Sequence, residues 1–372
     1  MHRWMVGLLA LASVPVLTQA APAQDVAPIA FDSVPDFLKL PDDVYLGEVS
    51  GIAVNSKGHI FVFSRAGSSH GPAFRNTAAE LFEFAPNGRL MREIGKNLYA
   101  WSFAHMVRVD KDDNIWAIDK GSDMVIKFNP QGRVVMVFGR KPEASAAESK
   151  PYEPVKTPRP QIDGLFRQPT DVAWDTKGDI FISDGYVNAR VAKFDKDGNW
   201  VKSWGHHGTG PGEFNTVHSI ANDAQGTLYV ADRFNRRIQV FDDDGNLKKI
   251  ITIDVPFDPN ARPAIGNKPD LTDYKTKGGT FTPGAPWSIC ITPPPHQVMY
   301  VSDAYPGRVY KLTLDGKVLG WLGESGKQLK QFGWVHQIAC PSENVIFVAE
   351  LLNWRVQKLI LHPTPAQTAT AK

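Results

Sequence analysis

Three histidines recur in one register of an internal repeat: His105, His218 and His336. Each stands eleven residues before the aromatic residue of a short apolar run. Three imidazoles that meet and leave a fourth position open form the ligand set of a catalytic zinc ion. The alternative is three unrelated core histidines, each with its own hydrogen bond. Because the chain has only 10 histidines in 372 residues, the shared register favours the metal site.

The repeat that carries the histidines occurs six times. Aligned on the aromatic, its copies contain residues 60–62, 115–117, 180–182, 228–230, 299–301 and 346–348. Repeats of roughly 40 to 50 residues with short alternating strands are typical of propeller blades, because one small sheet cannot bury both faces until neighbours stack on it. We therefore predict an all-β, six-bladed β-propeller. Its first strands line the central channel, so the histidines of blades two, four and six should meet on the axis.

An acid follows the aromatic by three residues in five of the six copies. These acids are Asp119, Asp184, Asp232, Asp303 and Glu350. Since each strand pair folds back on itself, the acids and the histidines share one face of the ring. A carboxylate opposite a histidine could orient its imidazole. Two of the acids occur in blades without a histidine, so a structural role that ties strand to loop is the stronger alternative.

Basic and phenolic side chains follow these acids on the same face. Arg65 and Arg233 occupy matching positions in blades one and four, with Lys120 at that position in blade two, and Tyr186 follows Asp184 by two residues. A guanidinium can hold a carboxylate with two hydrogen bonds, and a nearby cation lowers the pKa of a phenol, which can then act as a base. We predict Tyr186, Arg65 and Arg233 as catalytic residues; for the arginines, a plain surface position is the alternative.

The two ends of the chain differ from the repeats. Residues 1–23 read as a signal peptide, because an apolar run follows Arg3 and Ala21-Pro22-Ala23 resembles a cleavage site. We expect an exported protein, secreted or periplasmic, without a membrane span. Residues 24–361 are predicted to form one domain, in which an N-terminal strand completes blade six and closes the ring. Residues 362–372 are expected to be disordered.

Composition excludes some partners. The net charge is +2, with 41 basic and 39 acidic residues interspersed, so nothing indicates nucleic-acid binding. We expect a monomer that binds a small-molecule or peptide substrate. Cys290 and Cys340 fall in first strands of adjacent blades, where a disulfide is geometrically conceivable. Two buried thiols are the preferred interpretation.

The chain resembles the lyase domain of the peptidylglycine α-amidating enzymes, a six-bladed propeller related to NHL repeats. The resemblance covers about residues 45–361 and is most specific in three segments: 168–174 (Gln-Pro-Thr-Asp-Val-Ala-Trp), 181–190, which contains Ser-Asp-Gly-Tyr, and 211–241, which contains Ala-Asp-Arg-Phe-Asn. It implies a zinc ion held on the axis by His105, His218 and His336. It also implies a catalytic tyrosine at Tyr186 and functional arginines at Arg65 and Arg233. Such enzymes split a peptidyl-α-hydroxyglycine into a peptide amide and glyoxylate.

Three positions depart from the pattern of that family. Gln337 replaces an aspartate that binds calcium, and a neutral amide weakens the case for a structural calcium ion. Trp334 replaces a pocket methionine, and Val187 replaces a cysteine. The resemblance therefore supports the metal site more firmly than the peptide substrate.

The sequence as a whole predicts an exported, zinc-dependent carbon–nitrogen lyase. Its substrate is expected to be an α-hydroxyglycine-type carbinolamide with a carboxylate, and its products an amide and glyoxylate. One alternative is a metal-dependent, lactonase-type hydrolase; three histidines in place of carboxylate ligands count against it. The other is a non-catalytic NHL-propeller ligand-binding protein; the presence of Tyr186 and both arginines counts against it.

Overall fold

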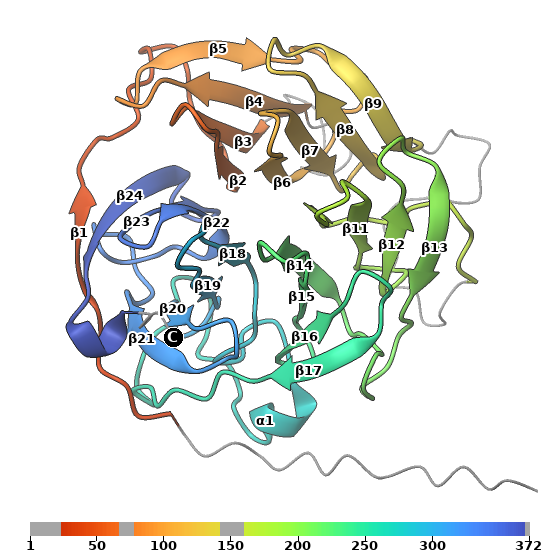
Figure 1. The fold of residues 1–372 in the computed structure, drawn as a ribbon. Coiled ribbons are helices and arrows are strands. Elements are labelled where there is room, and N and C mark those ends of the chain that lie inside the picture. The colour runs from red at the N-terminus through yellow and green to blue at the C-terminus, as the bar shows by residue number, and fades with distance from the viewer. Residues whose placement is uncertain (1–23, 67–77, 142–159, 369–372) are drawn as a thin grey trace, which may run out of the picture.

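Six four-stranded antiparallel sheets form a ring in the computed structural model, which describes residues 24–66, 78–141 and 160–368 (Figure 1). The predicted all-β, six-bladed propeller is confirmed. Besides strands, the described residues include a short helix, α1 (Tyr274–Lys277), and a 3-10 helix (Pro365–Gln367). No helix among these residues is long and apolar enough to cross a membrane.

Blades one to three are built from consecutive strands, with the first strand nearest the axis (Figure 1). Blade one contains β2 (Val49–Val54), β3 (Ile60–Ala66), β4 (Ala78–Phe84) and β5 (Leu90–Ile94). Blade two contains β6 (Ala104–Val109), β7 (Ile115–Asp119), β8 (Met124–Phe128) and β9 (Val134–Gly139). Blade three contains β10 (Asp171–Trp174), β11 (Ile180–Asp184), β12 (Arg190–Phe194) and β13 (Trp200–Trp204).

Blades four and five follow the same plan, and blade six borrows its outer strand from the N-terminal segment. Blade four contains β14 (Val217–Asn222), β15 (Leu228–Asp232), β16 (Arg237–Phe241) and β17 (Leu247–Ile251). Blade five contains β18 (Ile289–Ile291), β19 (Met299–Ser302), β20 (Val309–Leu312) and β21 (Val318–Leu322). Blade six contains β22 (Val335–Ser342), β23 (Val345–Glu350), β24 (Arg355–His362) and β1 (Ala30–Val34).

The core lies between neighbouring blades. The second strands β7, β11 and β15 are buried along their whole length, because the blades on either side cover the two faces of each sheet. Between blades two and three, Trp116, Phe138, Phe166 and Phe194 pack in one cluster, with the rings of Phe138 and Phe194 4.8 Å apart. This packing makes the ring rigid and fixes where the inner ends of the first strands lie.

The N-terminal strand closes the ring, as predicted. β1 pairs antiparallel with β24, with Phe31 opposite Leu361, and the two strands lie side by side in Figure 1. Ile29 is buried in the cluster between blades five and six. Blade six thereby gains its fourth strand, and β24 has no open edge.

Deleting residues 24–46 should lower the melting temperature by on the order of 10 °C, because β24 loses its ladder partner and Ile29 its buried contacts. Calorimetry of the shortened chain against one that starts at Gln24 measures the effect. Deletion of residues 369–372 controls for shortening as such. An unchanged melting temperature would show that closure does not depend on β1.

Two expectations need correction. Cys290 and Cys340 form a disulfide rather than two free thiols. Their strands, β18 and β22, lie in adjacent blades and place the two cysteine Cα atoms 6.0 Å apart, within the range that a disulfide spans. The expected disorder from residue 362 onward does not hold for the described part of the tail. Its 3-10 helix is anchored by buried Gln367, whose side chain donates to the Ala27 and Pro28 carbonyls. Residues 369–372 and the predicted signal peptide, residues 1–23, lie outside the described residues.

Candidate active site

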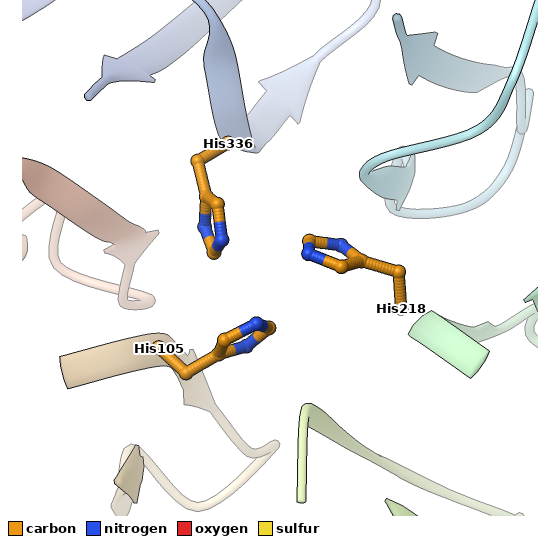
Figure 2. A group of neighbouring side chains, drawn as sticks. All are labelled: His105, His218 and His336. Atoms are coloured by element: carbon orange, nitrogen blue, oxygen red, sulfur yellow. The ribbon is translucent and has the colours of Figure 1, made fainter. Parts of the chain in front are cut away.

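Each of the three predicted metal ligands occupies an irregular position in the first strand of its blade. The ladder register shifts between Ala104 and Met106, so that His105 has no partner opposite it. The same shift occurs at His218 in β14 and at His336 in β22. A bulge of this kind redirects the side chain of the extra residue. The three imidazoles accordingly point toward one another from three blades (Figure 2).

The histidine cluster is compact and fully buried. The potential ligand atoms of His105, His218 and His336 all lie within 4.8 Å of one another. Their ring centroids are 4.6 to 4.9 Å apart, and no side chain is more than 1% exposed. The predicted convergence on the propeller axis is therefore observed, and the three side chains form a candidate metal site.

Backbone carbonyls fix the tautomer of each histidine. The Nδ1 atoms lie 2.6 to 2.7 Å from three carbonyl oxygens, those of Thr170, Trp287 and Ser50. A carbonyl can only accept, so Nδ1 carries the hydrogen and Nε2 keeps a lone pair. The three carbonyls come from the histidine register of the blades that lack a histidine. Blades that supply a ligand thus alternate with blades that orient one.

The charge state of the cluster suits a metal ion. Burial lowers the pKa of each histidine well below its usual value. Neighbouring positive groups lower it further, with Arg65 acting on His336 and Arg233 on His218. Neutral imidazoles with their Nε2 lone pairs directed into one space are what a divalent transition-metal ion requires.

The acids of the second strands serve the loops and not the histidines. Asp119 accepts the backbone N–H groups of Ser102, Phe103 and Ser122. Asp232 and Glu350 likewise accept backbone N–H groups and side-chain amides. The imidazole Nδ1 atoms already donate to carbonyls, so the acids do not orient them. The hydrogen bonds support the alternative role, in which each acid ties its strand to a loop. Asp184 and Asp232 thereby hold the short segments that carry Tyr186 and Arg233.

Tyr186 reaches the histidines from the loop after β11. Its hydroxyl lies 3.3 Å from Nε2 of His105. The preceding residue must be glycine, because a Cβ atom on Gly185 would lie 1.7 Å from the carbonyl oxygen of Val217 in the next blade. Burial raises the pKa of the Tyr186 phenol, but Lys120, Arg233 and Arg65 lower it by more, so that its net direction is downward. A phenol that ionises more readily than usual is suited to accept a proton.

The two predicted arginines lie at the same end of the axis. The guanidinium carbon of Arg233 is 5.4 Å from the Tyr186 ring centroid and 4.1 Å from that of Trp287. Arg65 pairs with Glu48 and donates its Nε–H to the Ala104 carbonyl at 3.1 Å. The structure therefore brings all six predicted site residues together, and their roles remain predictions.

Aromatic residues that were not predicted as site residues flank the histidines. Trp287 lies 4.5 Å from His218 between ring centroids and 4.8 Å from Trp334. Phe281, from the long segment before blade five, packs 4.8 Å from Trp334. The repeat register could have identified Trp287 as a residue near the axis, because it stands at the histidine position of blade five. No sequence signal identifies Phe281.

The surroundings of Gln337 do not fit a calcium ion. Its side-chain oxygen accepts the backbone N–H groups of Ile52 and Val107, at 2.9 and 3.1 Å. Its amide nitrogen donates to the Val107 carbonyl at 2.8 Å. Calcium needs oxygen ligands with free lone pairs, and here an N–H donor faces the carbonyl. The amide links blades six, one and two through these hydrogen bonds.

Comparisons with known proteins agree with the propeller fold. A family profile described as a 6-bladed beta-propeller matches residues 162–277. A Caenorhabditis elegans protein named probable peptidyl-alpha-hydroxyglycine alpha-amidating lyase is 28% identical over 311 residues, which cover 72% of this chain and 83% of the relative. The chain is related to the peptidyl-α-hydroxyglycine α-amidating lyases. This relationship confirms the resemblance found in its motifs.

Other relatives extend the comparison. The rat peptidylglycine alpha-amidating monooxygenase is 28% identical over 329 residues, 74% of this chain. The match spans only 31% of that longer protein. Among solved structures, a streptogramin B lyase superposes with a TM-score of 0.51 at 15% identity, covering 90% of this chain and 98% of the other, and shows the shared fold alone. The relationship to amidating lyases supports a related enzymatic function for this chain.

Proposed function

We propose that this protein is a zinc-dependent lyase that cleaves the C–N bond of an α-hydroxyglycine-type carbinolamide to an amide and glyoxylate. The observation that carries the proposal is the hydroxyl of Tyr186 beside three converging, neutral imidazoles, 3.3 Å from the ligand atom of His105. A base and a metal site at this separation can act on one substrate oxygen. The relatives named as amidating lyases support the same reaction.

A zinc ion bound by His105, His218 and His336 would supply Lewis acidity to the substrate hydroxyl. Tyr186, as phenolate, would remove the proton of that hydroxyl. The oxygen then forms the C=O bond of glyoxylate, the C–N bond breaks, and the nitrogen takes up a proton to give the amide. Arg65 and Arg233 would hold the substrate carboxylate and the charge that develops beside it.

We also propose that the protein is exported and that it is a monomer. Residues 1–23 carry the signal-peptide pattern, and the disulfide between Cys290 and Cys340 suits an oxidising compartment. We infer that the protein acts outside the cytoplasm on a small-molecule or peptide substrate that bears a carboxylate. Mass spectrometry of the exported chain would locate its N-terminus.

The reaction is tested with N-benzoyl-α-hydroxyglycine and zinc-loaded protein, and we expect benzamide and glyoxylate in equal amounts. Chromatography of both products measures turnover, and a protein-free sample corrects for spontaneous breakdown. Release of neither product above that blank would contradict the lyase assignment. A simple lactone, assayed in parallel, should not be hydrolysed.

A further inference from the structure

One register of the propeller carries a cation in three blades. Four residues after the aromatic of the second strand, the six blades have Arg65, Lys120, Gly185, Arg233, Ala304 and Leu351. The two arginines already belong to the proposed site. Lys120 stands at the same position in blade two, on the loop that Asp119 holds through the Ser122 N–H group. The fold therefore places a third cation at the same end of the axis.

Lys120 lies against the proposed base. Its ammonium nitrogen is 4.1 Å from the Tyr186 ring centroid and 4.9 Å from that of Phe103. Its backbone N–H donates to the Phe103 carbonyl at 3.0 Å, which fixes the start of the side chain. These contacts direct the ammonium to the space beside Tyr186 and its neighbour His105.

The charge of Lys120 is less well compensated than that of Arg65. Arg65 forms an ion pair with Glu48, whereas Lys120 forms no ion pair within residues 24–66, 78–141 and 160–368. Burial lowers the pKa of Lys120; attraction to Tyr186 and Asp119 opposes this effect, and repulsion from Arg65 and Arg233 adds to it. Lys120 is only partly exposed and faces two guanidinium groups, so a ligand that brings negative charge to this place would be stabilised.

We propose that Lys120 binds the carboxylate of the substrate and makes the site selective for acidic carbinolamides over neutral ones. Lys120 thereby adds a donor to the carboxylate site of Arg65 and Arg233, in which Glu48 and the Ala104 carbonyl already occupy much of the hydrogen-bonding capacity of Arg65. The inference rests on the proposed function for the identity of the substrate. The binding of a carboxylate by Lys120 can be tested without turnover.

Hippurate and hippuramide provide the test, because they lack the α-hydroxyl group and differ only in the carboxylate. Calorimetry with zinc-loaded wild-type protein should show tighter binding of hippurate. Lys120→Met should lower the affinity for hippurate by roughly ten- to hundredfold, the range for a hydrogen bond to a charged group. The affinity for hippuramide should stay unchanged. Lys120→Arg, which keeps the charge, should recover most of the preference.

Lys358→Met is the matched control, since Lys358 also lies over an aromatic ring, 4.7 Å from that of Phe37, but on β24 in the outer part of blade six. It should bind both compounds as the wild type does. The melting temperature of Lys120→Met should not fall, because the substitution removes a cation that is repelled by Arg65 and Arg233 and keeps a side chain of similar length. A fall in melting temperature together with an equal loss of affinity for both compounds would indicate a structural role and overturn the proposal.

Failure of this inference can be told from failure of the proposed function. Unchanged hippurate binding and an unchanged KM for N-benzoyl-α-hydroxyglycine in Lys120→Met would overturn the role of Lys120 while the lyase reaction stands. Lys120-dependent hippurate binding without glyoxylate release would support the carboxylate site and contradict the lyase. Absence of any hippurate preference in the wild-type protein would also overturn the inference.

Discussion

Alanine at His218 is expected to reduce bound zinc from about one ion per chain to a small fraction, and glyoxylate release with it. Three imidazoles share one ion, so the substitution leaves two protein ligands, fewer than a tight zinc site uses. His218 also offers an Nε2 atom that is buried and has no hydrogen-bond partner among the described residues. Elemental analysis of the purified variant, after dialysis against trace zinc, measures the occupancy.

The control for this experiment is His296→Ala, because His296 is an exposed histidine in the turn between β18 and β19. Its zinc content and turnover should match the wild type. The substitution at His218 also removes the donor to the Trp287 carbonyl, which costs about 1–3 kcal/mol of stability. Melting curves of the metal-free wild type and variant separate this cost from the loss of metal. Full occupancy in the double variant His105→Ala, His218→Ala would exclude the axial site.

The register of the repeat predicted the histidine cluster because a propeller turns equal sequence positions into equal positions around an axis. Once His105, His218 and His336 fell in alternate blades, their convergence followed from the fold. The same argument identified the position of Lys120 but not its surroundings. Whether an ammonium at that position pairs with an acid, as Arg65 does with Glu48, depends on loop conformations that the repeat does not determine.

Contacts between blades could not be predicted from the sequence for a related reason. The carbonyls that orient the imidazoles are backbone atoms, whose identity carries no sequence signal. Whether Cys290 and Cys340 form a disulfide depends on the distance between β18 and β22. The repeat register predicted only that these strands belong to adjacent blades. Gln337 was recognised as a departure from a calcium ligand, yet its amide bridge to Val107 became visible only in the folded ring.

Tyr186→Phe should lower turnover by a factor on the order of 10² to 10⁴, the range for the loss of an acid–base group. The substitution removes only the hydroxyl 3.3 Å from Nε2 of His105 and keeps the ring that contacts Lys120. Zinc content and hippurate affinity should therefore stay close to those of the wild type. Single-turnover measurements with N-benzoyl-α-hydroxyglycine isolate the chemical step from product release.

Tyr229→Phe is the matched control for the loss of a buried hydroxyl, since Tyr229 lies in β15 and is 4% exposed, with its hydroxyl directed at Asp223. That variant should turn over substrate as the wild type does. If Tyr186→Phe releases glyoxylate at the wild-type rate, the phenol takes no proton in the reaction. Its position beside His105 would then serve to fill space near the metal site, and the positive charges of Arg233 and Lys120 would act on the substrate alone. A lowered rate with unchanged hippurate binding leaves proton transfer as the function of the hydroxyl, because neither the metal ligands nor the carboxylate site has changed.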